Sequence, residues 1–432
     1  MASGANATAT GVTSSASGTN SSVYGVSSVA MGIASTAIGA SSVASGDNST
    51  AVGTQSSAIG TNSAAYGVAS AAYGSGSFAA GHNAVAGVAG AASSTTDDIA
   101  IGDGASATGG ASISMGTGAT ASTANAVAIG TGAIATSGRA VSVGYANTAS
   151  GNGAVAIGDP NIATGTGAVA IGANNTATGQ GAVALGNASQ ANGAGAVAMG
   201  DSAQATQANA LAQGSHSVAS GINSAATGYA SVASGDYSSA YGTGAQALSY
   251  SSTALGDAAV ASAANATALG QQASASGANS LAAGYAAAAT GGDATAIGQG
   301  AQASAPNSVA LGANSVASEP NTVSVGAAGN ERRITNIAPG IGGTDAANMN
   351  QLNAVARHAY SGVAQAMAMP NVTPSAPGKT VVALGGGVYR GYAATGMGIT
   401  HRSENGRWLV NGALSYSNAG GQGARIQVGY EF

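Results

Sequence analysis

The stretch GAVAIGDPNIATGTGAVAIGANNTATGQGAVALG, residues 153–186, contains nearly the same sequence three times with a period of fourteen residues. The period continues outward in both directions. Glycines stand seven residues apart from Gly4 to Gly81, and after a gap of 21 residues they recur every fourteen residues from Gly102 to Gly326. Gly- and Ser-rich sequence of low charge is also typical of disordered linkers, but a strict period of this kind predicts a stacked repeat fold.

A seven-residue period could indicate a coiled coil, but the residue types favour strands. Gly in every heptad would destabilise a helix by about 1 kcal/mol each relative to Ala, and β-branched residues dominate between the glycines. Collagen requires Gly at every third residue and is excluded by the spacing. In the unit 308–314, Ser-Val-Ala-Leu-Gly-Ala-Asn, four alternating residues precede a Gly-x-Asn turn that tolerates positive φ. Each unit is therefore expected to form one strand and one turn, with two units to a coil.

The second strand position of each unit is almost always small, so it is expected to line the inside of a thin, two-sheeted roll. An apolar fraction of 45% that is mostly Ala, with 4% aromatic residues, suits such a core and excludes an ordinary core of large side chains. The inward row contains Ala100, Ala107, Ala121, Ala128, Ala135, Ala149, Ala156, Ala163, Ala170 and Ala177, with Ser114 and Ser142 as the changes in that interval.

The outward positions differ between the two halves of the coil. One half carries polar pairs such as Thr120/Ser122, Thr176/Thr178 and Gln190/Asn192, and the other half carries aliphatic pairs. Aliphatic rows over about fifteen coils would expose far more apolar surface than a soluble monomer tolerates, so copies of the same chain are expected to cover them. The predicted interface in the head consists of Val127, Ile129, Val155, Ile157, Val169, Ile171, Val183 and Leu185.

The regular pattern changes near residues 82–100. Before residue 82 the apolar rows, for example Ile38, Val52 and Tyr66, are half a coil out of step with those that follow. The insert HNAVAGVAGAASSTTDDIA is expected to absorb this change. Asp97 and Asp98 within it are interpreted as a solvated loop rather than a catalytic dyad.

Charge and reactive residues argue against several function classes. Residues 1–330 contain one basic residue, Arg139, and ten acidic ones, which disfavours nucleic acid and anionic surfaces as partners of this part. The chain has no Cys, and its four histidines, at 82, 216, 358 and 401, lack metal-ligand spacing or an evident carboxylate partner. Acidic residues that directly follow one of the periodic glycines, such as Asp47 and Asp236, are interpreted as turn residues rather than calcium ligands. No catalytic, cofactor or metal site is predicted, and an enzyme is not expected.

After residue 330 the repeat ends in NERRITNIAPGIGGTDAANMNQLN, residues 330–353. This stretch resembles the neck of trimeric autotransporter adhesins, the YadA-like family, although Pro339-Gly340 stands where that family often has small residues. The preceding AVAIG repeats also resemble that family's head, so the resemblance covers nearly the whole chain. The residues that match the neck are Arg333, Ile334, Thr335, Asn336, Thr344, Asp345, Asn348, Gln351 and Leu352.

A helix and four strands are predicted beyond the neck. Residues Leu352, Val355, Ala359, Gly362, Ala366 and Met369 follow alternating three- and four-residue steps, which predicts a helical seam of small residues that packs somewhere tight. From Lys379 onward, four segments of about ten residues alternate like outer-membrane strands, although soluble antiparallel strands would give a similar pattern. Their expected interfacial anchors are Trp408, Tyr416, Tyr430 and Phe432.

Four strands cannot close a barrel, and lipid does not tolerate an open sheet edge. Two chains would supply eight strands and three would supply twelve, with evident room for helices in the larger barrel alone. Gly385, Gly386, Gly387, Gly396 and Gly398 are expected to give backbone clearance to a helix in the lumen, although strand flexibility is an alternative reason for them. No run of eighteen apolar residues predicts a transmembrane helix, and MASGANATAT lacks the features of a signal peptide, so an exported chain is expected to be a mature form.

The resemblance implies an all-β-dominated homotrimer. Its expected parts are a left-handed parallel β-roll head at 1–329, a neck at 330–352, a short coiled-coil or pore helix at 353–372 and an anchor at 373–432, which contributes four strands to a twelve-stranded barrel. The resemblance further implies an outer-membrane anchor in contact with lipid, a head at the cell surface, and a C-terminal Tyr-x-Phe end that is read by the barrel assembly machinery.

Three functions are compatible with this organisation. The first is attachment to host cells or extracellular matrix, with the barrel supporting export. The second is structural self-association in aggregates or biofilm without a specific receptor. A third is ice or crystal binding by a flat Thr array, which Gln190, Val218 and Ala288 interrupt and which a thermal-hysteresis measurement would decide.

Overall fold

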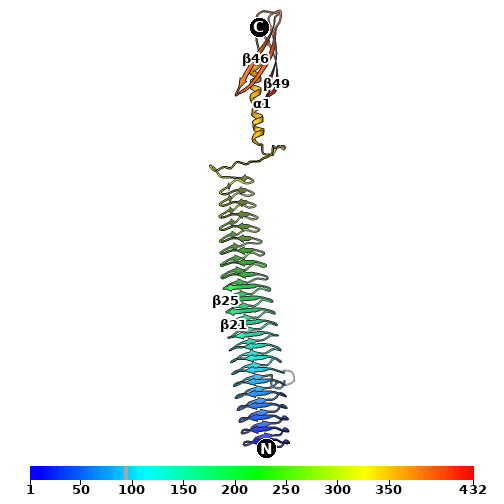
Figure 1. Cartoon of the computed structure of the whole chain (residues 1–432), viewed down its shortest axis with the longest axis vertical. Coiled ribbons are helices and arrows are strands. Elements are labelled where there is room, and N and C mark those ends of the chain that lie inside the picture. Colours follow the sequence, from blue (N-terminus) through cyan, green and yellow to red (C-terminus); the bar gives the residue numbers. More distant parts are fainter. Residues whose placement is uncertain (92–95) are drawn as a thin grey trace. The chain divides into compact units, whose positions relative to one another are not determined.

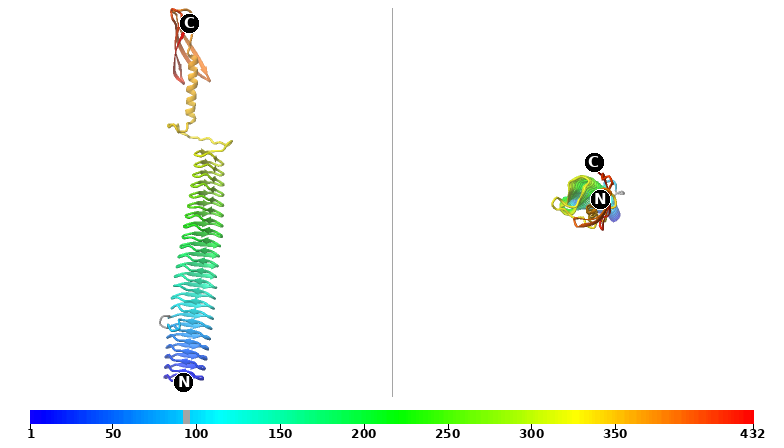
Figure 2. Two further views of the ribbon diagram at one scale, coloured as in Figure 1. Left: turned by 180° about the vertical axis from the view of Figure 1, so that it is seen from behind. Right: turned by 90° about the horizontal axis from the view of Figure 1, so that it is seen from above.

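The computed structural model describes residues 1–91 and 96–432 and divides into two compact units, Met1–Arg332 and Arg333–Phe432. The first unit is a stack of short parallel strands (Figures 1 and 2). Odd-numbered strands, from β1 (Thr8–Thr10) to β45 (Val323–Ser324), form one sheet, and even-numbered strands, from β2 (Ser15–Ala16) to β44 (Val316–Ala317), form the other. In β21 (Val155–Asp159) and β23 (Val169–Ala173), Val155 pairs with Val169 and Ile157 with Ile171. The predicted fourteen-residue coil of two strands is therefore confirmed.

Alanine fills the space between the two sheets. All ten alanines of the predicted inward row, together with Ser114 and Ser142, are fully buried. Many of the buried serines at the corners donate their hydroxyl to a nearby carbonyl, as where Ser28 Oγ donates to the Gly25 carbonyl at 2.7 Å and Ser35 Oγ to the Gly32 carbonyl at 2.7 Å. The small side chains let the two sheets approach closely along the whole roll, which is the reason that the chain needs so few large residues.

The periodic glycines are required by the close stacking of successive coils as well as by their backbone conformation. Gly158 and Gly172 have φ angles of +124° and +121°. A Cβ atom on Gly158 would lie 1.9 Å from the carbonyl oxygen of Gly172 on the next coil. In the unit 308–314, Gly312 and Asn314 both have positive φ, at 107° and 56°, so the predicted turn chemistry is confirmed.

A ladder of buried asparagines, which the sequence analysis did not single out, joins the coils between residues 147 and 189. Asn147, Asn161 and Asn175 are at most 1% exposed. Asn161 Nδ2 donates to the Ile157 carbonyl at 2.9 Å and to the Gly172 carbonyl at 2.7 Å, while Asn161 Oδ1 accepts from the Asn175 backbone N–H at 3.0 Å. One side chain thus satisfies backbone groups on its own coil and on the next one.

Asn161→Ala is expected to loosen this part of the roll by about 2–3 kcal/mol, because the substitution leaves buried donors and acceptors without partners. Hydrogen exchange of the intact protein should show faster exchange for the amides of residues 155–189. Asn192→Ala, which removes an exposed amide that accepts from Thr178 Oγ1 at 3.2 Å, should change exchange little. Similar exchange in the two variants would contradict the role of the ladder.

The insert keeps the two sheets in register. The connection from β12 (Val85–Ala86) to β13 (Ile99–Ile101) spans residues 87–98, where the equivalent connection from β2 to β3 (Ser22–Tyr24) spans residues 17–21. The additional seven residues shift the sequence by half a coil, so that Ala80 of β11 (Phe78–Ala80) pairs with Ile101. Ile38, Val52 and Tyr66 therefore stand in the same column as Ile129. The expected function of the insert is confirmed, while residues 92–95 of it lie outside the described residues.

Two interpretations around the insert are wrong. Asp98 is fully buried, and its Oδ1 accepts from the N–H groups of Gly110 and Ser112 and from the Ser112 hydroxyl at 2.6 Å, so this carboxylate is a buried clamp rather than part of a solvated loop. His82, expected to lack a carboxylate partner, contacts Asp103 with 2.8 Å between Nδ1 and Oδ1. Both contacts join residues on stacked coils, which a local sequence pattern does not reveal.

The second unit contains one helix and an antiparallel sheet (Figure 1). Helix α1 spans Met349–Ala368, and the sheet has the order β46 (Thr380–Tyr389), β47 (Tyr392–Arg402), β48 (Trp408–Ser417) and β49 (Gly421–Tyr430). The predicted bounds of the helix, 353–372, are wrong at both ends. Asn348 caps the helix within the segment assigned to the neck, and Pro370, which lacks a backbone N–H, follows its last residues.

Candidate functional surfaces

The predicted interface residues of the head lie together on the outer face of the odd-numbered sheet. The fourteen-residue register places Val127, Val155, Val169 and Val183 in one column and Ile129, Ile157, Ile171 and Leu185 in the next. The Val column is half-buried within one chain, whereas Ile157 and Ile171 remain 37% and 39% exposed. The geometry thus brings all eight residues onto a single apolar face. That copies of the chain cover this face remains a prediction.

The outer face of the even-numbered sheet is mostly polar, as expected, but the sequence analysis missed an apolar part of it. Thr120, Ser122, Thr176 and Thr178 lie on this face. The earlier coils instead carry apolar side chains there, and residues 1–46 contain no charged side chain. Outward apolar residues of these coils include Val29, Met31, Ile59 and Tyr73.

The end of the roll is closed by Arg332, a residue that the sequence analysis did not single out. Its guanidinium donates to the Ser315 hydroxyl at 2.8 Å, to the Val325 carbonyl at 2.7 Å and to the Ala313 carbonyl. These groups belong to the last coils, whose carbonyls have no further strand to pair with. The Arg332 guanidinium therefore donates hydrogen bonds to carbonyls that a further coil would otherwise pair with.

The neck motif organises the start of α1. Asn348 Oδ1 accepts from the Gln351 N–H at 3.1 Å, and Gln351 Oε1 accepts from the Asn348 N–H at 3.2 Å and from the Gly340 N–H at 2.9 Å. Asp345 accepts from the N–H groups of Gly342 and Ile341, and these bonds lower the pKa of its carboxyl. A lowered pKa means that the contact is kept at neutral pH and lost as the pH falls through the folded-state value.

The other residues of the neck motif make no comparable contribution to the cap of α1. Arg333, Ile334, Thr335, Asn336, Thr344 and Leu352 are exposed within one chain. The structure thus explains Asp345, Asn348 and Gln351 by local hydrogen bonds, while the contact of Leu352 with other chains stays a prediction.

Asn348→Ala is expected to destabilise the beginning of α1 by about 1 kcal/mol, because the first helical N–H groups lose their side-chain acceptor. Faster hydrogen exchange should appear at residues 349–352 and leave residues 361–368 unchanged. Asn353→Ala, in the first turns of the same helix but outside the cap, is the control and should have little effect. Equal exchange at residues 349–352 in both variants would contradict the capping role.

Helix α1 has two distinct faces. Ser361, Ala364, Gln365 and Ala368 are buried against the strands of the same chain. Most of the predicted seam lies on another side, where Leu352 and Val355 are 57% and 66% exposed and Ala359, Gly362 and Ala366 are also exposed. Met369, its last predicted member, instead follows the end of α1 and is half-buried beside Gly423 of the sheet. One face of the helix is thus occupied by its own sheet, and the seam is left free for other helices.

The sheet of the second unit is apolar on its outer face and small or polar on its inner face. Leu384 and Ile426 are each 82% exposed, whereas Thr400, Asn411 and Ser415 are buried on the helix side. This alternation is the inverse of a soluble sheet and is typical of outer-membrane strands. Trp408, Tyr416, Tyr430 and Phe432 are exposed, with Trp408 against Tyr430 at 4.8 Å and Tyr430 against Phe432 at 5.2 Å between ring centroids.

Four of the five predicted clearance glycines lie against the helix segment. A Cβ atom on Gly385, Gly387 or Gly396 would come within 2.4 Å of a carbonyl oxygen of α1, and on Gly398 within 2.6 Å of the Pro370 carbonyl oxygen. Gly386 faces outward, with its nearest atom 4.0 Å away, so its predicted role is wrong. The sequence analysis missed Gly420 and Gly423, where a Cβ atom would lie 2.5 Å from Ser361 Cβ and 2.9 Å from the end of the Met369 side chain.

Polar groups also tie the end of α1 to β48 and β49. Gln365 Nε2 donates to the Gly421 carbonyl at 2.6 Å, and Arg425 donates to the Met369 carbonyl at 3.3 Å and to Asn411 Oδ1 at 3.4 Å. These residues are inward-facing and half-buried or buried. The helix is therefore held by direct contacts with the strands and is more than a connector between head and sheet.

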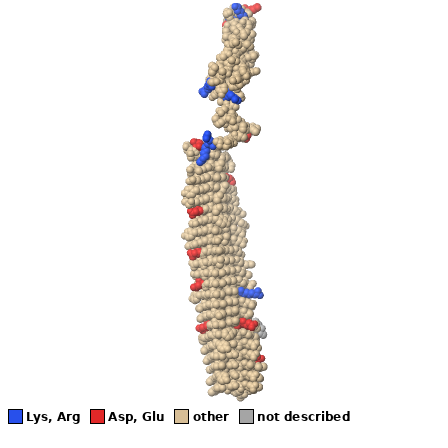
Figure 3. Space-filling model, viewed as in Figure 1, with Lys and Arg blue, Asp and Glu red and all other residues tan. Residues whose placement is uncertain are grey.

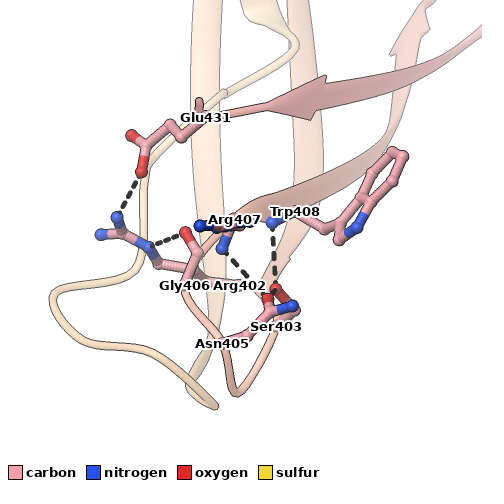
Figure 4. Close-up of polar contacts among 7 residues, drawn as sticks. All are labelled: Arg402, Ser403, Asn405, Gly406, Arg407, Trp408 and Glu431. Carbon is pink, nitrogen blue, oxygen red and sulfur yellow. Dashed lines mark hydrogen bonds and ion pairs between the residues drawn. The ribbon is translucent and has the colours of Figure 1, made fainter.

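A compact polar network closes the other end of the sheet, where the chain terminates (Figure 4). Arg402 pairs with Glu431 at 2.6 Å, Ser403 Oγ accepts from the Trp408 N–H at 3.0 Å, and Asn405 Oδ1 accepts from the Arg407 N–H at 3.2 Å. The network fixes the turn between β47 and β48 beside the terminal aromatic residues.

The described residues offer no convergent group for acid–base or metal chemistry. All four histidines are exposed, and no cluster of three or more His, Asp or Glu side chains that could hold a metal occurs in residues 1–91 and 96–432. Asp47 and Asp236 accept from the N–H groups of Ile33 and Ile222, each at 2.8 Å, as expected for turn residues. Among the same residues, no helix is both long enough and apolar enough to cross a membrane.

Comparison with known families finds matches along most of the chain. A YadA-like membrane anchor domain matches residues 372–432. A YadA head domain repeat matches overlapping segments that together cover more than half of the chain, at 2–56, 107–133, 135–159, 163–189, 191–217, 219–245 and 247–328.

Individual relatives match over shorter lengths. The chain is 38% identical over 112 residues to autotransporter adhesin NhhA of Neisseria meningitidis, a match that covers 23% of this chain and 19% of NhhA. It is 33% identical over 127 residues to autotransporter adhesin EhaG of Escherichia coli O157:H7, which covers 24% of this chain and 8% of EhaG. The aligned part thus spans a fifth or less of these relatives.

A solved structure, the collagen-binding domain of the Yersinia adhesin YadA, is 32% identical and covers 38% of this chain and 83% of that domain. The TM-score of 0.30 is too low for this match to define the fold.

Proposed function

The chain belongs to the YadA-like family of trimeric autotransporter adhesins, and from this premise we propose that it attaches bacteria to host cells or extracellular matrix through its β-roll head. The match of both the head repeats and the anchor to an adhesin family carries this proposal. Two incomplete apolar surfaces, one on the odd-numbered sheet of the head and one around the sheet of the anchor, support assembly from several chains. Named relatives are autotransporter adhesins, which supports the same class of function.

Assembly of three chains would complete both surfaces. The sheet order leaves β46 and β49 as edges, and an edge within lipid must pair with another strand. Three chains would give twelve strands around three helices packed along the seam of Val355, Ala359 and Ala366. The same threefold arrangement would bury the Val and Ile columns of the head.

The family and its anchor domain indicate an outer-membrane protein at the cell surface. Four antiparallel strands return the chain to the side on which β46 begins, so the start of α1 and the C terminus are expected on opposite sides. We place the C terminus in the periplasm, where its aromatic end would meet the barrel assembly machinery, and the head outside. The lumen that holds α1 is the proposed route of export.

Self-association is a second candidate function. Its support is the outward apolar set Val29, Met31, Ile59 and Tyr73 on coils where charge is sparse. Like-charged acidic heads would repel one another less there than elsewhere. Purified head should bind immobilised matrix proteins if attachment is the function, whereas aggregation of expressing cells without any matrix binding would favour self-association.

Removal of the anchor tests the proposed location. A chain that ends before Lys379 should be secreted or degraded rather than retained, because it lacks every strand of the sheet. Surface labelling and fractionation of cells would measure this, with the full chain as the control. Normal surface retention of the shortened chain would refute the anchor assignment.

A further inference from the structure

The two ends of the anchor unit differ in charge. At the end where the chain terminates, Arg402 pairs with Glu431 (Figure 4). Glu404 stands in the turn between β47 and β48. At the opposite end, basic residues occur alone, with Arg390 in the turn between β46 and β47 and Arg357 in α1. Figure 3 shows blue side chains without red neighbours at this end of the second unit. The sequence contains no Asp or Glu between Asp345 and Glu404. The second end is therefore cationic without an internal counter-charge.

Arg390 is held in place although it is exposed. Its guanidinium carbon lies 5.4 Å from the centre of the Tyr360 ring, and that ring packs against Tyr389 at 5.9 Å and Tyr392 at 6.2 Å. Arg390 has a φ of 47°, which turns the chain from one strand into the next. The aromatic group restricts the side chain, so less conformational entropy is lost when the guanidinium binds an anion.

Arg357 stands on the same end, one helical turn before Tyr360, and is also exposed. In the part of the chain that the structure describes, the ion pairs are His82–Asp103 and Arg402–Glu431, and neither involves Arg357 or Arg390. Two guanidinium groups near one rim, without carboxylate partners, suit a doubly charged or branched anion.

We propose that Arg390 and Arg357 bind the phosphate groups of lipid A, the glycolipid of the outer leaflet. Val388, two residues before Arg390, is 66% exposed on the outer face of the sheet, so the turn that carries Arg390 stands at the end of the apolar face, where headgroups would begin. Arginine matches phosphate oxygens with two parallel hydrogen bonds. The proposal rests on the orientation proposed above, and three chains would carry three such sites.

Native mass spectrometry of the full-length, detergent-solubilised trimer with added diphosphoryl lipid A tests the proposal. Arg357→Gln with Arg390→Gln should weaken lipid A binding by about tenfold or more, given a loss of roughly 1 kcal/mol for each cation near an anionic lipid surface. Lys379→Gln with Arg407→Gln, which removes the same charge from the opposite end, should leave binding within about twofold. Dephosphorylated lipid A should bind the unaltered trimer weakly.

A pair of conservative substitutions distinguishes the effect of lost charge from the effect of impaired folding. Arg357→Lys with Arg390→Lys should retain most of the binding, since the charge stays although the bidentate geometry is lost. Unchanged binding in the Gln pair, equal binding of dephosphorylated lipid, or competition by millimolar inorganic phosphate that abolishes binding would each overturn the assignment to lipid A. Adhesion of cells to matrix is read separately, so failure of the adhesive function would leave this result intact.

Discussion

Gly387→Ala is expected to prevent assembly of the anchor, whereas Gly386→Ala, one residue earlier, is expected to leave assembly intact. A Cβ atom on Gly387 would lie 2.3 Å from the Ala364 carbonyl oxygen and 2.8 Å from the Ala368 nitrogen, both in the backbone of α1. A side chain could rotate away, but helix backbone can relieve this overlap only if the whole helix moves. We expect a cost of about 3 kcal/mol or more in each chain.

The neighbouring glycine is a matched control. Gly386 lies in the same strand, has no left-handed φ, and would place its Cβ atom no nearer than 4.0 Å to another group. The amount of heat-resistant trimer in outer-membrane fractions measures assembly on unheated gels. We expect a decrease of about tenfold or more for Gly387→Ala and nearly wild-type amounts for Gly386→Ala. Equal amounts of trimer in the two variants would show that α1 does not occupy the lumen as described.

The glycine run also shows what sequence reasoning can establish about this anchor. A concentration of Gly in predicted membrane strands indicates that polypeptide passes close to them, and Gly385, Gly387, Gly396 and Gly398 confirm this. Strand alternation alone could have separated Gly386 from its neighbours, but the helix-facing parity of β46 becomes certain only from the contacts with Ala364 and Ala368. Likewise, Gly420 belongs to a turn, where no alternation applies.

The repeat architecture of the head could be predicted from the sequence, whereas its buried polar contacts could not. Period and side-chain size were sufficient to derive the coil, the Ala interior and the outward Val and Ile rows, because each repeat supplies the same evidence again. The buried Asn161 and Asp98 depend instead on which residue stands directly above another, fourteen or more positions away. Asn also suits an exposed turn, as at Asn314, so its residue type alone does not distinguish a corner from a buried ladder.

The first residue of α1 is determined by a capping interaction and not by the seam pattern that predicted the helix. The seam pattern begins at Leu352 and predicted a helix after the neck, but Asn348 and Gln351 form a reciprocal cap that starts the helix at Met349. The family motif and the helix start therefore share residues. Gln351 in addition fixes Gly340, so the neck sequence determines the entry of the chain into α1.

Val169→Asp with Ile171→Asp is expected to abolish trimer formation by the head. Both side chains lie on the outer face of β23, where Val169 is half-buried and Ile171 is 39% exposed in a single chain. If three copies meet on this face, the double variant brings six carboxylates into one apolar layer. Each buried, unpaired charge costs several kcal/mol, which exceeds what the remaining Val and Ile contacts of that layer contribute.

Thr176→Asp with Thr178→Asp is the matched control, since it adds the same charge on the same coil but on the even-numbered sheet. That face is predicted to remain in water, where added carboxylates cost little. Sedimentation of purified head should therefore give a trimer for the Thr variant and a monomer or aggregate for the Val–Ile variant. The reverse result would mean that the polar sheet faces the axis, and equal disruption would mean that neither flank is free.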